Sequence, residues 1–184
     1  VQFEELKPAV RFTGKGNILP SSDGLILPFE AVNLKMVEVQ IVRIFENNIV
    51  QFLQVNNFDG NSELRRVGKP VLKKIISLEN SGVTDLGKWN RFTLDLASLI
   101  NTEPGAIYQV RINIKKSYTA LACNEGDDQS TAGFETEEDW SGGENEYSYW
   151  DSYEDYYYDY DYDWQERDNP CHSSYYTGQR NIKK

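Results

Sequence analysis

Apolar side chains recur at every second position over short stretches of the first two thirds of the chain, a period that is typical of β-strands. The clearest case is 36–45, where Val37, Val39 and Ile41 share one face. Val42 and Ile44 then shift the phase, as at a bulge or at an end that is buried on both faces. We therefore predict a central strand at 36–45.

Six further stretches predict the other strands of the same domain. Pro28, within 25–32, indicates an edge or bulge position, because proline has no N–H to donate. We expect both 10–13 and 25–32 to lie at the margin of a sheet. The stretches 89–96 and 107–114 flank a turn at 103–105 and are expected to pair like a hairpin. About seven strands result, at 10–13, 25–32, 36–45, 63–67, 70–78, 89–96 and 107–114.

One segment departs from the alternation. Ile49, Phe52 and Leu53 have the i, i+3, i+4 spacing of a helix face, and Asn47 and Asn48 precede them as candidate caps. We predict a single short helix there. Strands with almost no helix predict an all-β fold, a seven-stranded antiparallel β-sandwich of the fibronectin or immunoglobulin type. Such a fold specifies no function by itself.

A strongly acidic, tyrosine-rich segment follows the predicted sandwich. Residues 124–170 hold 17 of the 29 acids, eight of the 12 tyrosines, three of the four tryptophans and one basic residue. The segment therefore carries 1 minus 17, or −16, and the rest of the chain carries 18 minus 12, or +6. Opposite charges on one tethered chain favour an intramolecular contact and disfavour nucleic acid as a partner.

The two cysteines of the chain, Cys123 and Cys171, stand at the two ends of this segment. Cysteines at the borders of a polar loop predict a disulfide, and hence an oxidising compartment. Closing a loop of this size contributes roughly 4 kcal/mol in the loop-entropy description. We expect a sandwich at 1–122, a disulfide-closed acidic insertion at 123–171, and a following domain's beginning or a terminal strand at 172–184.

Candidate chemistry in the acidic segment is limited. Asp159, Asp161 and Asp163 have the 1, 3, 5 spacing of a calcium loop, but Trp164 and Pro170 stand where that loop needs Gly and Glu. One histidine and two paired cysteines do not supply four zinc ligands, and exposed acids have no apolar pocket to separate their pKa values. We therefore expect no enzyme activity and no cofactor. We also expect no membrane segment, because no apolar run approaches about 20 residues.

The aromatic residues give the segment apolar area that a purely acidic linker lacks. We hypothesise that part of 147–164 packs on the basic sandwich. The aromatic side chains expected to dock, or to bind a partner, are Tyr156, Tyr158, Tyr160, Tyr162 and Trp164. The cations expected to meet the carboxylates are Arg65, Arg66, Lys69, Lys73 and Lys74.

Six phrases in the strands and turns carry a family resemblance. They are VRFTGKGNILP at 10–20, LPFEAVN at 27–33, VQIVRIF at 39–45, QFLQV at 51–55, DLGKWNRFTLDL at 85–96 and EPGAIYQVR at 103–111. Together they cover most of 9–118 and resemble a macroglobulin-like β-sandwich domain of the bacterial α2-macroglobulin family. The match lies in ordered strand and turn phrases, without a catalytic signature.

The resemblance implies a scaffold domain of a large extracytoplasmic protein that traps a protease after its bait region is cut. It implies a periplasmic or cell-surface location, with a lipid anchor on the parent protein left open. The implied partners are the neighbouring domains of the parent chain and the target proteases. The family's thioester needs a Cys-x-Glu-Gln pattern, which neither Cys123 nor Cys171 begins, so no thioester residue is carried over.

The alternative function is that the acidic segment is itself a binding module for a basic protein or for calcium. A third reading, that the segment is a protease bait, is less favoured. Bait needs readily cleaved residues, and Arg167 is the one site here for a trypsin-like enzyme.

Overall fold

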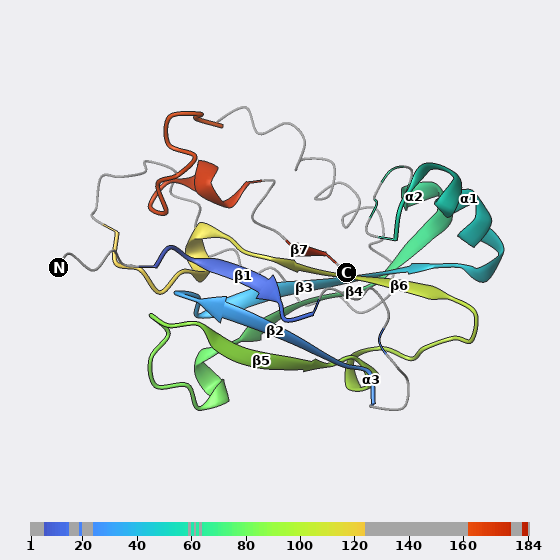
Figure 1. Ribbon diagram of the computed structural model, residues 1–184, viewed down its shortest axis with the longest axis horizontal. Helices are drawn as coiled ribbons and strands as arrows, with labels where there is room; N and C mark the ends of the chain where they lie inside the picture. The colour runs from blue at the N-terminus through green and yellow to red at the C-terminus, as the bar shows by residue number, and fades with distance from the viewer. Residues whose placement is uncertain are drawn as a thin grey trace.

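The computed structural model describes residues 6–14, 19, 24–58, 60, 62, 64–123, 162–177 and 182–183. Within this part of the chain, two antiparallel sheets pack face to face (Figure 1). The first has the order β1-β2-β5, with bounds Ala9–Phe12, Ile26–Val32 and Asn90–Asp95. The second has the order β4-β3-β6-β7, with bounds Gly68–Ser77, Met36–Ile44, Ile107–Asn113 and Ile182–Lys183. The predicted antiparallel β-sandwich is confirmed.

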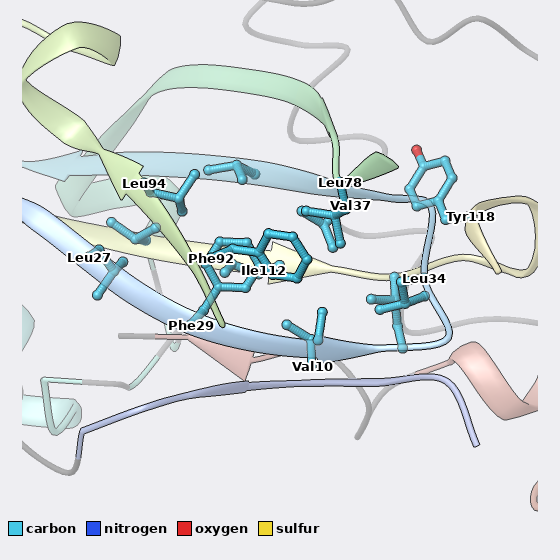
Figure 2. Packing of buried hydrophobic residues seen from close by; sticks show 14 of the residues in the cluster. Val10, Leu27, Phe29, Leu34, Val37, Leu78, Phe92, Leu94, Ile112 and Tyr118 are labelled. Atoms are coloured by element: carbon cyan, nitrogen blue, oxygen red, sulfur yellow. The ribbon is translucent and has the colours of Figure 1, made fainter. Parts of the chain in front are cut away.

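The main core lies between the two sheets, and Figure 2 shows the side chains that meet there. Phe29 of β2 stacks on Phe92 of β5, with their ring centroids 5.5 Å apart. Val37 and Ile112 reach the same cluster from β3 and β6. Because strand side chains alternate between faces, each strand contributes every second residue to this core. We call the faces that meet here the inner faces and the opposite faces the outer faces.

Strand β2 occupies the centre of the three-stranded sheet, so the marginal position predicted from Pro28 is wrong. The carbonyl of Pro28 accepts the N–H of Thr13, just beyond the last β1–β2 pair, Phe12 with Phe29. The nitrogen and carbonyl of one strand residue point to the same side, so the missing N–H of Pro28 also faces beyond the end of β1. A central strand therefore tolerates this proline without losing a ladder hydrogen bond.

Strands β5 and β6 belong to different sheets, and the predicted hairpin between them is wrong. After β5, the side chain of Asp95 accepts hydrogen bonds from the N–H groups of Ala97 and Ser98 and caps the short helix α3, Leu96–Leu99. This cap ends the strand and turns the chain away from its sheet. The chain then crosses to the second sheet, where β6 pairs with β3.

Strand β3 is the predicted central strand, lying between β4 and β6. Its pairing with β6 is continuous, so Val42 and Ile44 follow regular alternation and lie on the outer face. The register shift occurs against β4, where Ile41 pairs with Leu72 and Val42 with Pro70. The change of phase predicted for 36–45 is therefore explained by a strand end that is buried on both faces. The bulge lies in the neighbouring strand β4 and not in β3.

A small helical layer covers this end of the outer face. It contains a 3₁₀ turn, Glu46–Asn48, followed by α1, Ile49–Val55, and α2, Leu64–Val67. Phe52, Leu64 and Val67 pack with Val42 and Ile44 in a second hydrophobic cluster. Figure 1 shows α1 and α2 together at one end of the sheet pair.

Three expectations for this layer need correction. The stretch 63–67, expected to be extended, contains α2, because Leu64 and Val67 bury one helical face over β3. Leu53 is 41% exposed, since the layer buries only Phe52 and part of Ile49 from α1. The side chain of Asn48 does not cap α1 but donates to the carbonyl of Val67 over 3.1 Å.

The remaining short elements are 3₁₀ turns, with bounds Glu79–Ser81, Lys116–Tyr118 and Ser173–Tyr176. The turn Lys116–Tyr118 directs the chain from β6 toward Cys123, and its Tyr118 is buried in the main core. Among the described helices, none has the length and apolar character needed to cross a bilayer.

Candidate functional site

The acidic segment is joined to the sandwich through one disulfide. Cys123 and Cys171 are bonded, with their Cα atoms 5.5 Å apart, and the chain has no free cysteine. Both residues are half-buried. The predicted disulfide is therefore confirmed, and it brings the two ends of 124–170 together on the folded body.

The residues after Cys171 pack into the main core. Tyr175 and Tyr176 are 2% and 6% exposed, and their rings meet edge to face at 5.0 Å. The Tyr175 hydroxyl donates to the carbonyl of Pro8 over 2.9 Å, and the Tyr176 hydroxyl donates to that of Pro170 over 2.7 Å. Burial raises the pKa of Tyr176 to about 12. We call 162–177 the return segment; Figure 1 shows it in orange-red, near the end opposite α1 and α2.

Backbone contacts also hold the return segment. Lys7 Nζ donates to the carbonyl of Asp168 over 2.7 Å, and the Asp163 N–H donates to Ser174 Oγ over 2.8 Å. His172 Nδ1 accepts the N–H of Ser174 and caps the following 3₁₀ turn. Further along, β7 pairs with β6 and also contacts β1. The boundaries 1–122, 123–171 and 172–184 stay a prediction, but these contacts connect both ends of the described chain to one sandwich.

Of the three expected calcium ligands, Asp159 and Asp161 lie outside the described residues. Asp163 is described, and its Oδ1 accepts the N–H of Gln165 over 2.8 Å, as in an Asx turn. Within the described part of the chain, no group of three His, Cys, Asp or Glu side chains could hold a metal ion. Calcium binding stays a prediction.

The aromatic residues expected to dock are also divided. Tyr156, Tyr158 and Tyr160 lie outside the described residues. Tyr162 meets Trp164 edge to face at 5.0 Å, and Trp164 is 71% exposed. The described end of the aromatic run therefore presents Trp164 to solvent, and docking of the remainder stays a prediction.

The expected cations do not share one face of the sandwich. Lys73 pairs with Gln40, whose side chain lies on the outer face of the four-stranded sheet, whereas Lys74 pairs with Val39, which belongs to the main core. Neighbouring strand residues point to opposite faces. Lys73 and Lys74 therefore cannot contact the same bound segment from the same side.

The other three expected cations lie toward the helical end. Arg65 and Arg66 are exposed on α2, on the outer side of the sheet. Lys69 pairs with Arg43, on the same side as Lys74. Arg65, Arg66 and Lys73 thus lie on one side of the four-stranded sheet, and Lys69 and Lys74 on the other.

A row of polar side chains lies on the outer face of this sheet, beside the helical layer. We call it the polar strip: Glu38 and Gln40 of β3, Lys73 of β4, Arg111 and Asn113 of β6, and Lys115. Glu38 is 2% exposed, and Gln40 and Arg111 are each 9% exposed. Polar groups on the outer face of a sheet usually meet water, so their burial makes this row a candidate site.

Glu38 occupies the centre of the strip. Its Oε1 accepts hydrogen bonds from Gln40 Nε2 over 2.6 Å and from Asn113 Nδ2 over 3.1 Å. Its Oε2 lies 3.5 Å from Lys115 Nζ and 3.7 Å from Lys73 Nζ. A buried carboxylate is stable only when charge and hydrogen bonds compensate its lost hydration. Four neighbours provide that compensation.

Arg111 is held by a second set of hydrogen bonds. Its Nε and Nη2 donate to Gln109 Oε1 over 3.0 and 2.7 Å. Gln109 is fully buried, and its Nε2 donates to the carbonyl of Gly60 over 2.8 Å. The loop after α1 thus fixes the amide that orients Arg111. A guanidinium held in this way presents a preorganised cation to a carboxylate.

Glu38, Arg111 and Lys115 were not predicted as site residues from the sequence. Alternation alone assigns Glu38 and Gln40 to the face opposite Val37 and Val39, where polar residues are ordinary. The useful signal is that Glu38 and Gln40 of β3 lie directly opposite Asn113 and Arg111 of β6. That pairing depends on strand order and register, which were not predicted.

Comparisons with known proteins place the chain in a wider context. The sequence model of a family described as the bacterial alpha-2 macroglobulin MG2 domain matches residues 11–102. No curated protein matches the chain at a significant level.

Two solved structures of native alpha-2-macroglobulin from Escherichia coli are similar to the chain. One spans domains MG0-NIE-MG1; it is 15% identical, with a TM-score of 0.45, over 64% of this chain and 37% of that one. The other spans domains NIE-MG1; it is 21% identical, with a TM-score of 0.43, over 58% of this chain and 52% of that one. The chain therefore spans about half or less of each structure that it matches.

Proposed function

Because this chain belongs to the bacterial alpha-2-macroglobulin family, we propose that it is a non-catalytic scaffold domain of a protease-trapping protein. The family match over 11–102 carries the proposal, since it runs from β1 through α3 and includes strands of both sheets. The domain would contribute a rigid unit to the trap, and its partners would be neighbouring domains of the parent chain. The proteases would be bound by the assembled parent protein.

The chemistry of the polar strip supports a binding and structural role. Glu38 is engaged by two lysines and two amides, and Arg111 is held by Gln109. Catalytic acids and bases need a pKa near the working pH and access to a substrate proton. Buried side chains whose charges are already balanced by neighbours are better suited to holding a polypeptide segment in place than to transferring protons. The disulfide supports an extracytoplasmic location, because such bonds persist in oxidising compartments.

The proposal can be tested in the parent protein with a matched pair of variants. Phe29→Ala removes a ring from the main core, whereas Val50→Ala removes a side chain that is 73% exposed. A protease held in a trap should lose activity on a large protein substrate and keep activity on a small peptide. We expect Phe29→Ala, but not Val50→Ala, to reduce this selective loss.

Two results would count against the scaffold role. One is that a parent protein lacking residues 1–184 traps protease as well as the complete protein does. The other is that the parent protein abolishes activity on the large and small substrates equally, because that pattern indicates blocking of the active site instead of enclosure.

A second candidate function is binding of a basic protein by the acidic segment. The observation that favours it is a net charge of −16 over 124–170, between two bonded cysteines. Polylysine can serve as the probe, with binding to the complete chain measured at low salt and at 1 M NaCl. Calcium can be tested separately by titration calorimetry; absence of heat at millimolar calcium would end the metal hypothesis.

A further inference from the structure

We propose that the polar strip is the docking surface for the acidic segment of the same chain, residues 124–161. In this arrangement, carboxylates of the segment contact Lys73, Arg111 and Lys115 on the outer face of the four-stranded sheet. The site does not depend on the proposed scaffold function. It assigns a binding role to Arg111 and Lys115, which the sequence did not single out.

The charge of the strip suits an anionic occupant. Its described side chains include three cations, Lys73, Arg111 and Lys115, and one carboxylate, Glu38, which lies near the two lysines. The strip therefore has a positive excess. Lys73 has 16% of its side chain exposed and Arg111 is 9% exposed, so this charge is largely removed from water. Charges in such positions are stable when anionic groups accompany them.

The proposed occupant has a composition that matches the strip. Residues 124–161 contain 14 acids and no lysine, arginine or histidine. They also contain seven tyrosines and two tryptophans, which can cover apolar stems and place their π faces over cations. The segment is therefore complementary to the strip in charge, and it also carries the apolar area needed to cover it.

The points at which the segment is tethered also favour the strip. Cys123 follows Lys115 in the same short connection after β6, so the acidic segment begins close to the strip along the chain. After Cys171 and the return segment, β7 brings Lys183 opposite Arg111 and Ile182 opposite Ile112. The chain thus departs from β6 and returns to β6. Short tethers of this kind produce effective concentrations on the order of millimolar, which favours docking within one chain over binding between chains.

The register of β4 makes the proposal specific. Lys73 belongs to the outer face and the strip, whereas Lys74, the next residue, lies on the other side of the strand. A general attraction between an acidic segment and a basic domain would treat the two lysines alike. Docking on the polar strip would select Lys73.

Zero-length carbodiimide cross-linking of the complete wild-type chain, followed by mass spectrometry, tests this selection. The reagent joins a carboxylate to a lysine amine only when the two are in contact. We expect Lys73 and Lys115 to cross-link to acids of 124–161 about tenfold more than Lys74 does. The exposed pair Asp85 and Lys88, with Oδ2 and Nζ 2.9 Å apart, is the positive control.

Salt and isotopic labelling complete the test. At 1 M NaCl, where the Debye length is about 3 Å, the strip cross-links should fall several-fold, because salt weakens the attraction that brings the tethered segment to the strip. The Asp85–Lys88 product should remain, because its two residues are held close by their i, i+3 spacing. Mixing ¹⁵N-labelled and unlabelled chains distinguishes docking within one chain from binding between chains. Equal yields at Lys73 and Lys74, or strip cross-links that join labelled to unlabelled chains in the proportion expected for random pairing, would overturn the proposal.

A pair of arginine variants provides a readout that does not depend on lysine chemistry. Arg111→Gln removes a cation from the strip, and Arg91→Gln removes one from β5 in the other sheet. We expect Arg111→Gln to lower the hydrogen-exchange protection of 124–161 by about tenfold, as expected for loss of a charge-assisted contact. Arg91→Gln should leave the protection unchanged. Equal effects of the two substitutions would count against docking on the strip.

Discussion

The hydroxyl of Tyr175 donates a hydrogen bond to the carbonyl of Pro8 over 2.9 Å, although 167 positions separate the two residues. Both residues are buried. This contact joins the residues after the acidic segment to the residues just before β1. It makes the return segment part of the sandwich, so changes there should affect the stability of the whole domain.

Tyr175→Phe should destabilise the chain by about 1–3 kcal/mol, because the buried carbonyl of Pro8 loses its donor. Tyr175→Ala should cost about 3–5 kcal/mol, because it also leaves a cavity. Trp164→Ala is the control, since Trp164 is 71% exposed and its loss should cost less than about 0.5 kcal/mol. Urea denaturation measures all three; similar midpoints for Tyr175→Ala and Trp164→Ala would show that the return segment unfolds separately.

Loss of the Cys123–Cys171 disulfide should lower the free energy of unfolding by about 4 kcal/mol, from the entropy of a loop with a sequence separation of 48. The Cys123→Ala, Cys171→Ala double variant and the reduced wild-type chain should have similar unfolding midpoints. Reductant should not change the midpoint of the double variant. A wild-type midpoint that is unaffected by reduction would contradict a stabilising role for the bond.

Glu38→Gln should destabilise the fold by about 2–4 kcal/mol, because it leaves Lys73 and Lys115 without their shared carboxylate. Glu30→Gln is the matched control. Glu30 pairs with Arg11 at 2.7 Å, but 57% of the Arg11 side chain is exposed, so the loss should be below about 1 kcal/mol. Thermal or urea unfolding of both variants measures the two changes in the free energy of unfolding. Equal decreases would show that Glu38 and its lysines behave like an ordinary surface ion pair.

Stability should fall in alkaline solution as Tyr176 ionises. Burial raises the pKa of Tyr176 from 10.0 to about 12, so the folded state retains the neutral hydroxyl to higher pH than the unfolded state does. Stability from this group is fully present below pH 10.0 and is lost as the pH rises toward about 12. Tyr176→Phe should reduce the slope of unfolding free energy against pH in this window by up to about 1.4 kcal/mol per pH unit. An unchanged slope in urea titrations would contradict the assignment.

Phe52→Ala should cost about 3–5 kcal/mol, because Phe52 is fully buried between α1 and the outer face of β3. Leu53→Ala should cost less than about 1 kcal/mol, since Leu53 is 41% exposed. These two adjacent substitutions compare the stability contributed by the buried face of α1 with that contributed by its solvent-exposed face. The reverse order of unfolding midpoints would mean that α1 packs by a different face.

The alternation of apolar and polar residues was sufficient to predict the strands in which it continues over many positions. Phe92 and Leu94 lie inward as their period predicts, and β3 is central as its apolar content indicates. The prediction failed at 63–67, because two apolar residues three positions apart fit a single helical turn as well as an extended segment. It failed for the β5–β6 hairpin because the cap at Asp95 redirects the chain between sheets.

The candidate site was less predictable than the fold. The disulfide followed from two cysteines at the borders of one polar segment. Lys73 was among the predicted cations, but Lys74 was grouped with it although the two lie on opposite sides of β4. Arg111 and Lys115 were missed, because their importance depends on Arg111 lying opposite Gln40 on the neighbouring strand and on Lys115 lying beside Glu38.

Residue order alone was enough to predict the β-strand character of the chain, its family resemblance, and the charge and borders of its acidic segment. These features follow from covalent geometry, side-chain periodicity and composition, all of which are local. The folded chain was needed to show which sheet each strand joins, that Tyr175 and Tyr176 enter the main core, and that Glu38 is buried beside two lysines. Those outcomes depend on contacts between residues far apart in the chain, because burial and charge compensation arise only when the strands and the return segment pack together.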